Sequence, residues 1–258
     1  MSGTGIASRF DRTWRLFATG FAFAAMFLGA VPLALIVIPV ATLLSRDPVR
    51  RRRAQAMVRG AFRGYLWMLR ALRVIRLEVA GAERLAACRG RLVIANHPTL
   101  LDVVILMALV PNAQCVVKHQ LFRHPLMRHI VRAAGYLPND LAPEEMIARC
   151  VASLTSGDNL IIFPEGTRSP SGGLLPLQRG FAHVSTLAGC EIQPVRIGCE
   201  PPMLLRGDSW HRIPPVMPIF RVEVAPAVAV GPFLAGVERP LAARRLVSHF
   251  ERWYADQP

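Results

Sequence analysis

The chain has 258 residues, which is enough for one sizeable α/β domain and an appended segment. Its formal net charge of +14 indicates an anionic partner, and the lack of zinc-finger spacing, a helix-turn-helix pattern or aromatic-interleaved basic patches argues against nucleic acid. The five cysteines are widely spaced and odd in number, which argues against a disulfide framework or a metal site and predicts buried thiols in a reducing compartment.

An uncharged apolar segment, residues 16–44, is the first element of the chain. Its length exceeds the roughly 20 residues that a membrane-spanning helix needs. As a straight helix it would measure roughly 43 Å, longer than the hydrocarbon core of a bilayer but too short for two full spans. Pro32 and Pro39 interrupt the segment. It therefore predicts membrane association, either as a proline-broken hairpin or as a tilted single span.

Both flanks of the apolar segment are basic, so the positive-inside rule favours neither orientation for a single crossing. A hairpin that enters from the cytoplasmic face keeps both flanks on that face. Arginines beside an apolar anchor also predict contact with anionic membrane lipids. A cleaved signal peptide is the alternative, but the run is too long and lacks a clear small-residue cleavage site.

Residues 46–72 predict a basic amphipathic helix, because apolar positions in GAFRGYLWMLRAL recur every three or four residues. Such a helix would lie close to the membrane interface and link it to the remainder of the chain. We therefore expect three parts. They are a basic lead-in with the membrane hairpin or span at 1–45, an amphipathic linker helix at 46–75, and a globular domain at 76–258.

The globular part alternates short β-rich runs with helical patterns, which is typical of an α/β sheet with helices packed on it. The predicted strands lie within residues 74–81, 91–96, 114–119, 159–166, 191–198 and 220–228. The predicted helices lie near residues 101–110, 125–135, 144–156, 179–189 and 240–254. The proline-rich stretch 201–218 predicts a loop, which is long enough to be functional or membrane-facing.

The stretch NHPTLLD, residues 96–102, directly follows a predicted buried strand. Pro98 restricts His97 to extended conformations and suits a first helical turn, and Thr99 is a candidate cap. We expect His97 on the loop and Asp102 in the first turn of the helix, so that the carboxylate meets the imidazole. A carboxylate on one ring nitrogen fixes the tautomer and leaves the other nitrogen to accept a proton. Taken alone, the stretch also fits a capped helix start with a packed histidine.

The stretch FPEGTRS, residues 163–169, follows another predicted strand. Gly166 permits close backbone approach to a ligand, where successive amides can form an anion-binding nest. Arg168 presents a planar fork suited to phosphate, and Thr167 adds a hydroxyl donor. Glu165 would repel an anion unless it orients Arg168 or a substrate hydroxyl. Taken alone, the stretch also fits a strand-end turn with an Arg–Glu surface pair.

These two stretches, about sixty residues apart in this order, resemble the lysophosphatidate acyltransferase family of glycerolipid acyltransferases. That family carries N-H-x-x-x-x-D and then F-P-E-G-T-R-S. The resemblance extends over roughly residues 78–230 and implies the glycerolipid acyltransferase fold, an α/β mixed sheet flanked by helices behind an N-terminal membrane-anchoring segment. Residues 76–258 would then be the acyltransferase domain, on the cytoplasmic face of the inner (plasma) membrane.

The resemblance implies transfer of a fatty acyl group from acyl-CoA or acyl carrier protein to a lysophospholipid hydroxyl. The acceptor would be 1-acyl-glycerol-3-phosphate and the product phosphatidic acid. His97 matches the general base, and Asp102 matches the residue that orients it. The candidate acceptor- and phosphate-binding residues are Glu165, Gly166, Thr167, Arg168, Lys118 and Arg123.

One departure from the family pattern concerns the acceptor. A third family element matches between Lys118 and Gly135, but the arginine that many members place six residues after this glycine is replaced by Leu141. Lysophosphatidate would then depend on the cations named above and on Arg196. A lyso-ornithine lipid, or the hydroxyl of a specialised metabolite, is also compatible with this departure.

No cysteine or serine is placed as a nucleophile beside His97, which favours direct transfer in a ternary complex. His97 would take the proton of the acceptor hydroxyl, the oxygen would attack the thioester, and the thiolate would leave. Thioester cleavage requires no metal or cofactor. Two alternatives remain open: a non-catalytic lipid-binding homologue, and a hydrolase in which water replaces the acceptor.

Overall fold

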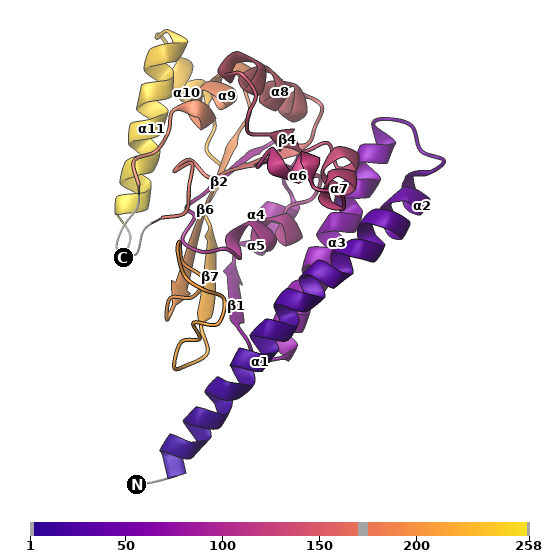
Figure 1. Cartoon of the computed structure of the whole chain (residues 1–258). Coiled ribbons are helices and arrows are strands. Elements are labelled where there is room, and N and C mark those ends of the chain that lie inside the picture. The colour runs from indigo at the N-terminus through magenta and orange to yellow at the C-terminus, as the bar shows by residue number, and fades with distance from the viewer. Residues whose placement is uncertain (1–2, 170–174, 257–258) are drawn as a thin grey trace.

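The computed structural model describes residues 3–169 and 175–256 (Figure 1). Its strands form a seven-stranded sheet in the order β1-β7-β6-β2-β5-β3-β4. Neighbouring strands are parallel except for β6 and β7, which are antiparallel. The strands are β1 (Arg76–Ala80), β2 (Leu92–Ala95), β3 (Ala113–Val117), β4 (Leu137–Pro138), β5 (Asn159–Ile162), β6 (Ile192–Glu200) and β7 (Ile219–Val224). The expected mixed α/β sheet is confirmed.

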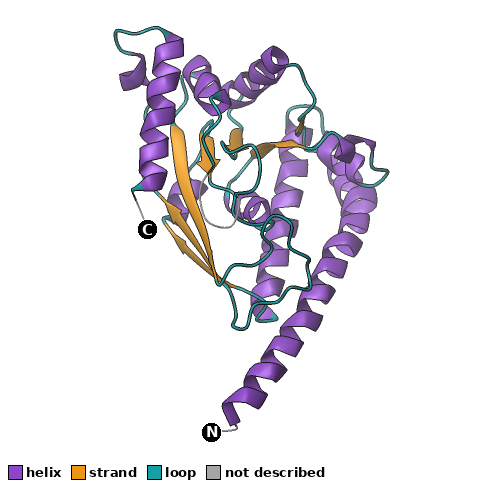
Figure 2. Cartoon of the chain, turned by 60° about the vertical axis from the view of Figure 1, so that its left-hand side comes forward, coloured by secondary structure: helices purple, strands orange, loops and turns teal. Residues whose placement is uncertain are grey.

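Helices cover both faces of this sheet (Figures 1 and 2). Successive residues of β2 alternate between two cores: Val93 packs with α5 on one face, and Ile94 packs with α9 and α11 on the other. Because both faces of β2 are buried, all four of its residues are apolar. The helices after β1 are α4 (Ala82–Ala86), α5 (Asp102–Leu109), α6 (Gln120–Arg123), α7 (Met127–Ala133), α8 (Pro143–Thr155), α9 (Gly180–Ala188), α10 (Gly231–Leu234) and α11 (Arg239–Ala255).

The apolar N-terminal segment is one long helical run. It consists of α1 (Gly3–Pro32), the π-helical turn η1 (Leu33–Val37) and α2 (Ile38–Thr42). A π-helical turn is a common site at which a helix accommodates a local irregularity, here between two prolines that remove backbone donors. The run does not reverse at either proline, so the expectation of a proline-broken hairpin within residues 16–44 is wrong.

The chain reverses after α2 and returns as α3 (Val49–Ala71), which packs against α1, α2 and α5 (Figure 1). The helical hairpin of this protein is therefore formed by the apolar run together with the basic amphipathic helix. Arg59 of α3 donates hydrogen bonds to the carbonyls of Ala108 and Leu109 at 3.1 and 2.9 Å. The last carbonyls of a helix have no partner within that helix, so these bonds attach α3 to the C-terminal end of α5.

The run from Asp11 to Thr42 is long and apolar enough to cross a membrane, as judged by length and composition. Several of its inward positions are small, as at Ala18, Ala22 and Ala34, which lets the run pack closely on the remainder of the protein. Its outward positions carry large apolar side chains that are exposed, which is typical of a surface that contacts lipid or another apolar partner. These side chains include Trp14, Phe17, Phe21, Phe27, Leu28, Leu35 and Ile36.

Arg15 attaches α1 to the proline-rich loop of residues 201–218. Its side chain is only 1% exposed, and its two terminal nitrogens donate to the carbonyls of Pro214 and Pro215 at 3.0 and 2.8 Å. Its Nε donates to the carboxylate of Asp11 at 3.1 Å. A buried guanidinium needs this degree of pairing, because an unpaired buried charge is costly. The loop is therefore held against the apolar helix.

Replacing Arg15 by Met keeps the apolar stem and removes the bonds to the loop. Hydrogen bonds to charged groups contribute about 1.5–3 kcal/mol, so we expect local opening of the loop to become about tenfold more frequent or more. Tryptic cleavage after Arg206 and Arg212, followed by mass spectrometry, measures this opening. The exposed Arg12→Met is the matched control, and equal cleavage rates in the two variants would contradict the assignment.

Candidate functional site

The two sequence motifs meet at one edge of the sheet. Strands β2, β5 and β3 are neighbours and parallel, so their C-terminal ends lie at the same edge. His97 follows β2, the turn of residues 163–169 follows β5, and Lys118 follows β3. The C-terminal edge of a parallel sheet is where α/β proteins place ligands and reacting groups. The topology thus brings together segments that are distant in the sequence.

His97 and Asp102 form a direct contact, with Nδ1 of the imidazole 2.9 Å from Oδ2 of the carboxylate. Thr99 supplies two further hydrogen bonds to this carboxylate. Its backbone N–H donates to Oδ2 at 2.7 Å, and its hydroxyl donates to Oδ1 at 2.6 Å. Burial raises the pKa of Asp102, and the bonds from His97 and Thr99 oppose that rise. With Nδ1 donating to the carboxylate, Nε2 of the ring is the nitrogen left to accept a proton.

The local chain explains how this contact forms. Helix α5 begins at Asp102, after a turn in which Thr99 Oγ1 accepts the backbone N–H of Leu101 at 3.2 Å. His97 therefore stands outside the helix, as expected. Pro98 was expected in the first helical turn, but it precedes the helix. The turn closed by Thr99 and Asp102, rather than the proline, sets the start of α5.

Two neighbours hold His97 in place, and neither is among the residues expected at the site. The side chain of Asn96 donates to the carbonyl of Ile197 at 2.8 Å and accepts its N–H at 2.7 Å, which extends the pairing of β2 with β6. The ring of Phe163 stacks on the His97 ring with centroids 4.1 Å apart. Asn96 and Phe163 are the first residues of the two motifs. Their place in the sequence beside the candidate residues is the feature from which they could have been predicted.

The carboxylate of Glu165 forms hydrogen bonds within the protein. Its side chain is buried and accepts the backbone N–H of His97 at 2.9 Å, the hydroxyl of Ser169 at 2.8 and 2.7 Å, and the N–H of Leu175 at 3.1 Å. Within the described residues it makes no ion pair with Arg168. Of the two roles expected for Glu165, that of orienting Arg168 is wrong, because two backbone N–H groups and the Ser169 hydroxyl take up the carboxylate.

Donors of the turn after Glu165 form hydrogen bonds within the protein, which leaves fewer of them for a phosphate. Gly166 adopts a left-handed φ of 72°, and its N–H donates to the carbonyl of Phe163 at 3.0 Å, so this amide is not available to a nest. Arg168 Nη1 donates to the carbonyls of Leu204 and Leu205 at 3.3 and 3.1 Å. Arg168 therefore holds the proline-rich loop with one nitrogen.

The remaining candidates differ in their surroundings. Lys118 and Arg123 are exposed near the sheet edge, while Thr167 is exposed on the turn. Arg196 is directed elsewhere: its Nη2 donates to the carbonyl of Trp253 at 2.6 Å, and its guanidinium lies 4.9 Å from the centre of the Trp253 ring. Arg196 therefore attaches α11 to the sheet, and its assistance to an acceptor phosphate stays a prediction.

The thiols of this protein are poor nucleophiles. Burial raises the pKa of Cys115 and of Cys199 to about 12, and those of Cys150 and Cys190 to about 11. The thiolate is the reactive form of cysteine, and it is scarce at neutral pH when the pKa is this high. The geometry thus favours proton abstraction by His97 over covalent chemistry at a thiol.

Comparisons with known proteins give a consistent result. The family model described as Acyltransferase matches residues 76–198. A 1-acyl-sn-glycerol-3-phosphate acyltransferase of Cocos nucifera is 32% identical over 108 residues, covering 40% of this chain and 35% of the relative. The corresponding enzyme of Limnanthes alba is 30% identical over 127 residues, covering 47% and 44%. The alpha form of Homo sapiens is 28% identical over 170 residues, covering 63% and 57%.

The alignment thus spans less than two thirds of the length of each of these relatives. A solved structure covers much more of the chain. The 1-acyl-sn-glycerophosphate (LPA) acyltransferase of Thermotoga maritima superposes with a TM-score of 0.71, covering 94% of this chain and 96% of that one. Their sequences are 19% identical, so this likeness shows a shared fold.

Replacing Asp102 by Asn should preserve the hydrogen bonds, because the amide oxygen can accept from Thr99 N–H and His97 while the amide nitrogen donates to the Thr99 hydroxyl. Burial raises the folded-state pKa of Asp102, so the native state binds this proton more tightly than the unfolded chain does. That effect makes the free energy of unfolding fall as pH rises from the ordinary pKa of 3.8 through the raised one.

Asn does not ionise, so the free energy of unfolding of the Asn variant does not fall in this pH range. We therefore expect its melting temperature in detergent to exceed that of the wild type at pH 7, with a smaller difference at pH 4. A pH-independent difference in melting temperature, or a less stable variant at pH 7, would show that burial of the ionised carboxylate does not destabilise the protein.

Proposed function

We infer that this chain, a member of the acyltransferase family through residues 76–198, is a membrane-bound O-acyltransferase. It moves a fatty acyl group from an acyl thioester, acyl-CoA or acyl carrier protein, to the hydroxyl of a lysophospholipid. The observation that carries the proposal is the contact of His97 with the buried Asp102 at the same sheet edge as the 163–169 turn. The relatives are named for 1-acyl-sn-glycerol-3-phosphate, which makes it the favoured acceptor.

The reaction follows from the geometry of the dyad. Nε2 of His97 takes the proton of the acceptor hydroxyl while its oxygen attacks the thioester carbonyl. Asp102 stabilises the positive charge that develops on the imidazole. The carbon–sulfur bond then breaks, and the thiolate that leaves regains the proton from His97. No protein nucleophile takes part, in agreement with the raised pKa values of the thiols.

The acceptor reaches the dyad from the side of the apolar helix. The exposed apolar side chains of α1, η1 and α2 lie in the membrane, with the acyltransferase domain on its cytoplasmic face. The loop of residues 201–218 connects this region to the site, because it contacts Arg15 of α1 and also Arg168. The carbonyl of Leu204 in that loop additionally accepts the N–H of Leu100, three residues after His97. Lys118 is the exposed cation that meets the acceptor phosphate.

The role of His97 is tested by replacing it with Ala and by replacing the exposed His129 as a matched control. General-base catalysis contributes about 10²–10⁴-fold, so we expect acyl transfer from radiolabelled acyl-CoA to lysophosphatidate to fall by that factor in the first variant alone. Equal activity of both variants would remove His97 from the mechanism. Rapid release of free fatty acid without any lysolipid would instead support hydrolysis.

The role of Lys118 in binding phosphate is tested by replacing it with Gln, with Arg149→Gln on α8 as the control. A hydrogen bond to a charged group contributes about 1.5–3 kcal/mol, so we expect the KM for lysophosphatidate to rise about tenfold or more while the KM for acyl-CoA is unchanged. An unchanged KM for lysophosphatidate would contradict phosphate binding by Lys118. Faster turnover of lyso-ornithine lipid than of lysophosphatidate by the wild type would identify the alternative acceptor.

A further inference from the structure

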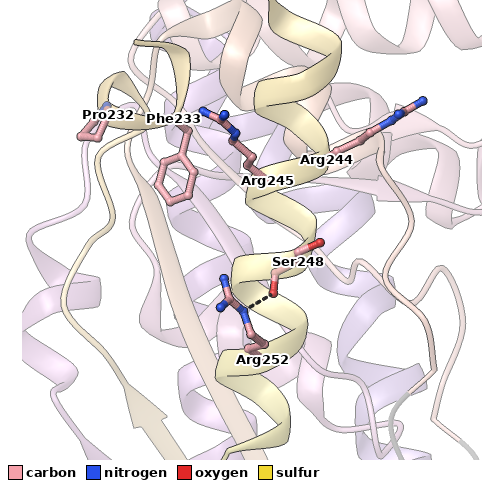
Figure 3. A pocket seen from close by; sticks show the side chains of 6 residues that line it. All are labelled: Pro232, Phe233, Arg244, Arg245, Ser248 and Arg252. Carbon is pink, nitrogen blue, oxygen red and sulfur yellow. Dashed lines mark hydrogen bonds between the residues drawn. The ribbon is translucent and has the colours of Figure 1, made fainter. Parts of the chain in front are cut away.

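A cleft lined by arginines lies between α10 and α11, outside the site described above (Figure 3). Its volume is about 480 Å³. Figure 3 shows the three arginine side chains projecting from α11, with the residues of α10 across the cleft. The described residues that line it are Pro232, Phe233, Arg244, Arg245, Ser248 and Arg252, and none of these is acidic. We call it the arginine cleft.

The sequence of α11 places these arginines on its solvent face. Leu246 and Phe250 are buried against the sheet, whereas Arg244, Ser248 and Arg252 recur every four residues and are exposed. Arg252 Nε donates to the carbonyl of Ser248 at 3.2 Å. Within residues 3–169 and 175–256, Arg244 and Arg245 form no salt bridge. The arginine cleft is therefore a site of uncompensated positive charge.

The acidic residues of α11 do not neutralise the cleft. Glu251 accepts the backbone N–H of Leu177 with its carboxylate at 3.4 Å, and Glu238 precedes the helix at its N-cap position. Neither lines the cleft. The positive charge is consequently available to an external anionic partner.

Membrane lipid does not account for this charge. Helix α11 packs on the core that contains Ile94 and Leu160, while α3 and α1 pack on the core of the opposite face, which contains Val93 and Ile161. Figure 1 shows α10 and the N-terminal half of α11 on the far side of the sheet from α2 and α3. A bilayer that covers the exposed side chains of the apolar helix thus lies away from the arginine cleft, which faces water.

The cleft is nevertheless connected to the site. Arg252 precedes Trp253, whose carbonyl accepts from Arg196 of β6, and the hydroxyl of Tyr254 donates to the carbonyl of Val195 at 3.1 Å. Val195 pairs in register with Ala95, two residues before His97. A large molecule seated over the arginine cleft therefore extends toward the sheet edge that carries the dyad.

We propose that the arginine cleft is the docking site for an acidic protein surface, that of the carrier protein which presents the acyl thioester to His97. The proposal rests on the proposed function. The arginines extend over about 12 Å along the helix, as eight residues at 1.5 Å each require. The planar guanidinium groups of these arginines can pair with carboxylates along a facing helix, and Phe233 and Pro232 supply an apolar contact. The cleft has no glycine-rich loop or buried charged side chain that would enclose a single phosphate.

The test is the double charge reversal Arg244→Glu/Arg245→Glu, assayed in non-ionic detergent. The same hexadecanoyl chain is supplied either on acyl carrier protein or on coenzyme A. The matched control is Arg63→Glu/Arg70→Glu, which reverses two exposed arginines on α3. Melting temperatures of both variants establish that they fold. Charge complementarity acts mainly on association, so we expect the KM for the carrier-protein donor to rise tenfold or more, with kcat and the coenzyme A reaction unchanged.

Binding of the carrier protein is measured separately from turnover, by biolayer interferometry at increasing salt. We expect the wild type and the control to bind in a salt-dependent manner and the α11 variant to lose most of its binding. An equal rise in KM for both donors would overturn the proposal and assign the cleft to the phosphates of coenzyme A. Unchanged kinetics of the α11 variant would also overturn it, as would a wild type that uses the coenzyme A donor but neither binds nor uses the carrier protein.

A wild type that transfers from neither donor would contradict the proposed function instead. In that case salt-dependent binding of the carrier protein that is lost in the α11 variant would still support the docking site, and absence of binding would overturn it.

Discussion

The hydrogen bond from the His97 backbone N–H to the Glu165 carboxylate, 2.9 Å long, joins the ends of two neighbouring strands, and the remainder of the site depends on this junction. Because the carboxylate is buried, it must be fully paired, and Ser169 and Leu175 supply the other donors. The return bond from the Ser169 N–H to the His97 carbonyl, at 2.8 Å, closes the connection. The backbone of His97 and the FPEGTRS turn therefore form one unit, and Asp102 has only to orient the ring.

The helical hairpin of α1, α2 and α3 is also connected to this unit, through α5 and through the proline-rich loop. Asp102 is the first residue of α5, and Arg59 of α3 binds the carbonyls at the opposite end of that helix. The proline-rich loop, held by Arg15 of α1, receives the guanidinium of Arg168. The apolar segment is thus in contact with both motifs through the elements beside it. The position of the two motifs relative to the apolar segment is therefore set by hydrogen bonds within the protein.

Much of this arrangement was readable in the sequence, because strand alternation and helical periodicity report burial directly. The sheet, its flanking helices, the loop position of His97 and its contact with Asp102 followed from local patterns. The reversal after α2 did not, since a π-helical turn preserves the helix where two prolines predict a break. The contacts of Glu165 and Arg196 could not be predicted either, because several of their partners are backbone groups distant in sequence, which carry no side-chain signal. Short elements such as β4 and α10 depend on tertiary packing rather than on their own periodicity.

The central claim is that Glu165 positions His97 and does not bind the acceptor. The most direct measurement is steady-state kinetics of Glu165→Leu with lysophosphatidate as the varied substrate. Leu is close to Glu in size and accepts no hydrogen bond, so the His97 N–H loses its acceptor. A displaced base lowers the rate of the chemical step, and misplacement by about 1 Å costs up to about 10²-fold. The account predicts a fall in kcat of about tenfold or more with the acceptor KM unchanged. A raised acceptor KM with kcat retained would contradict it and return Glu165 to the acceptor site.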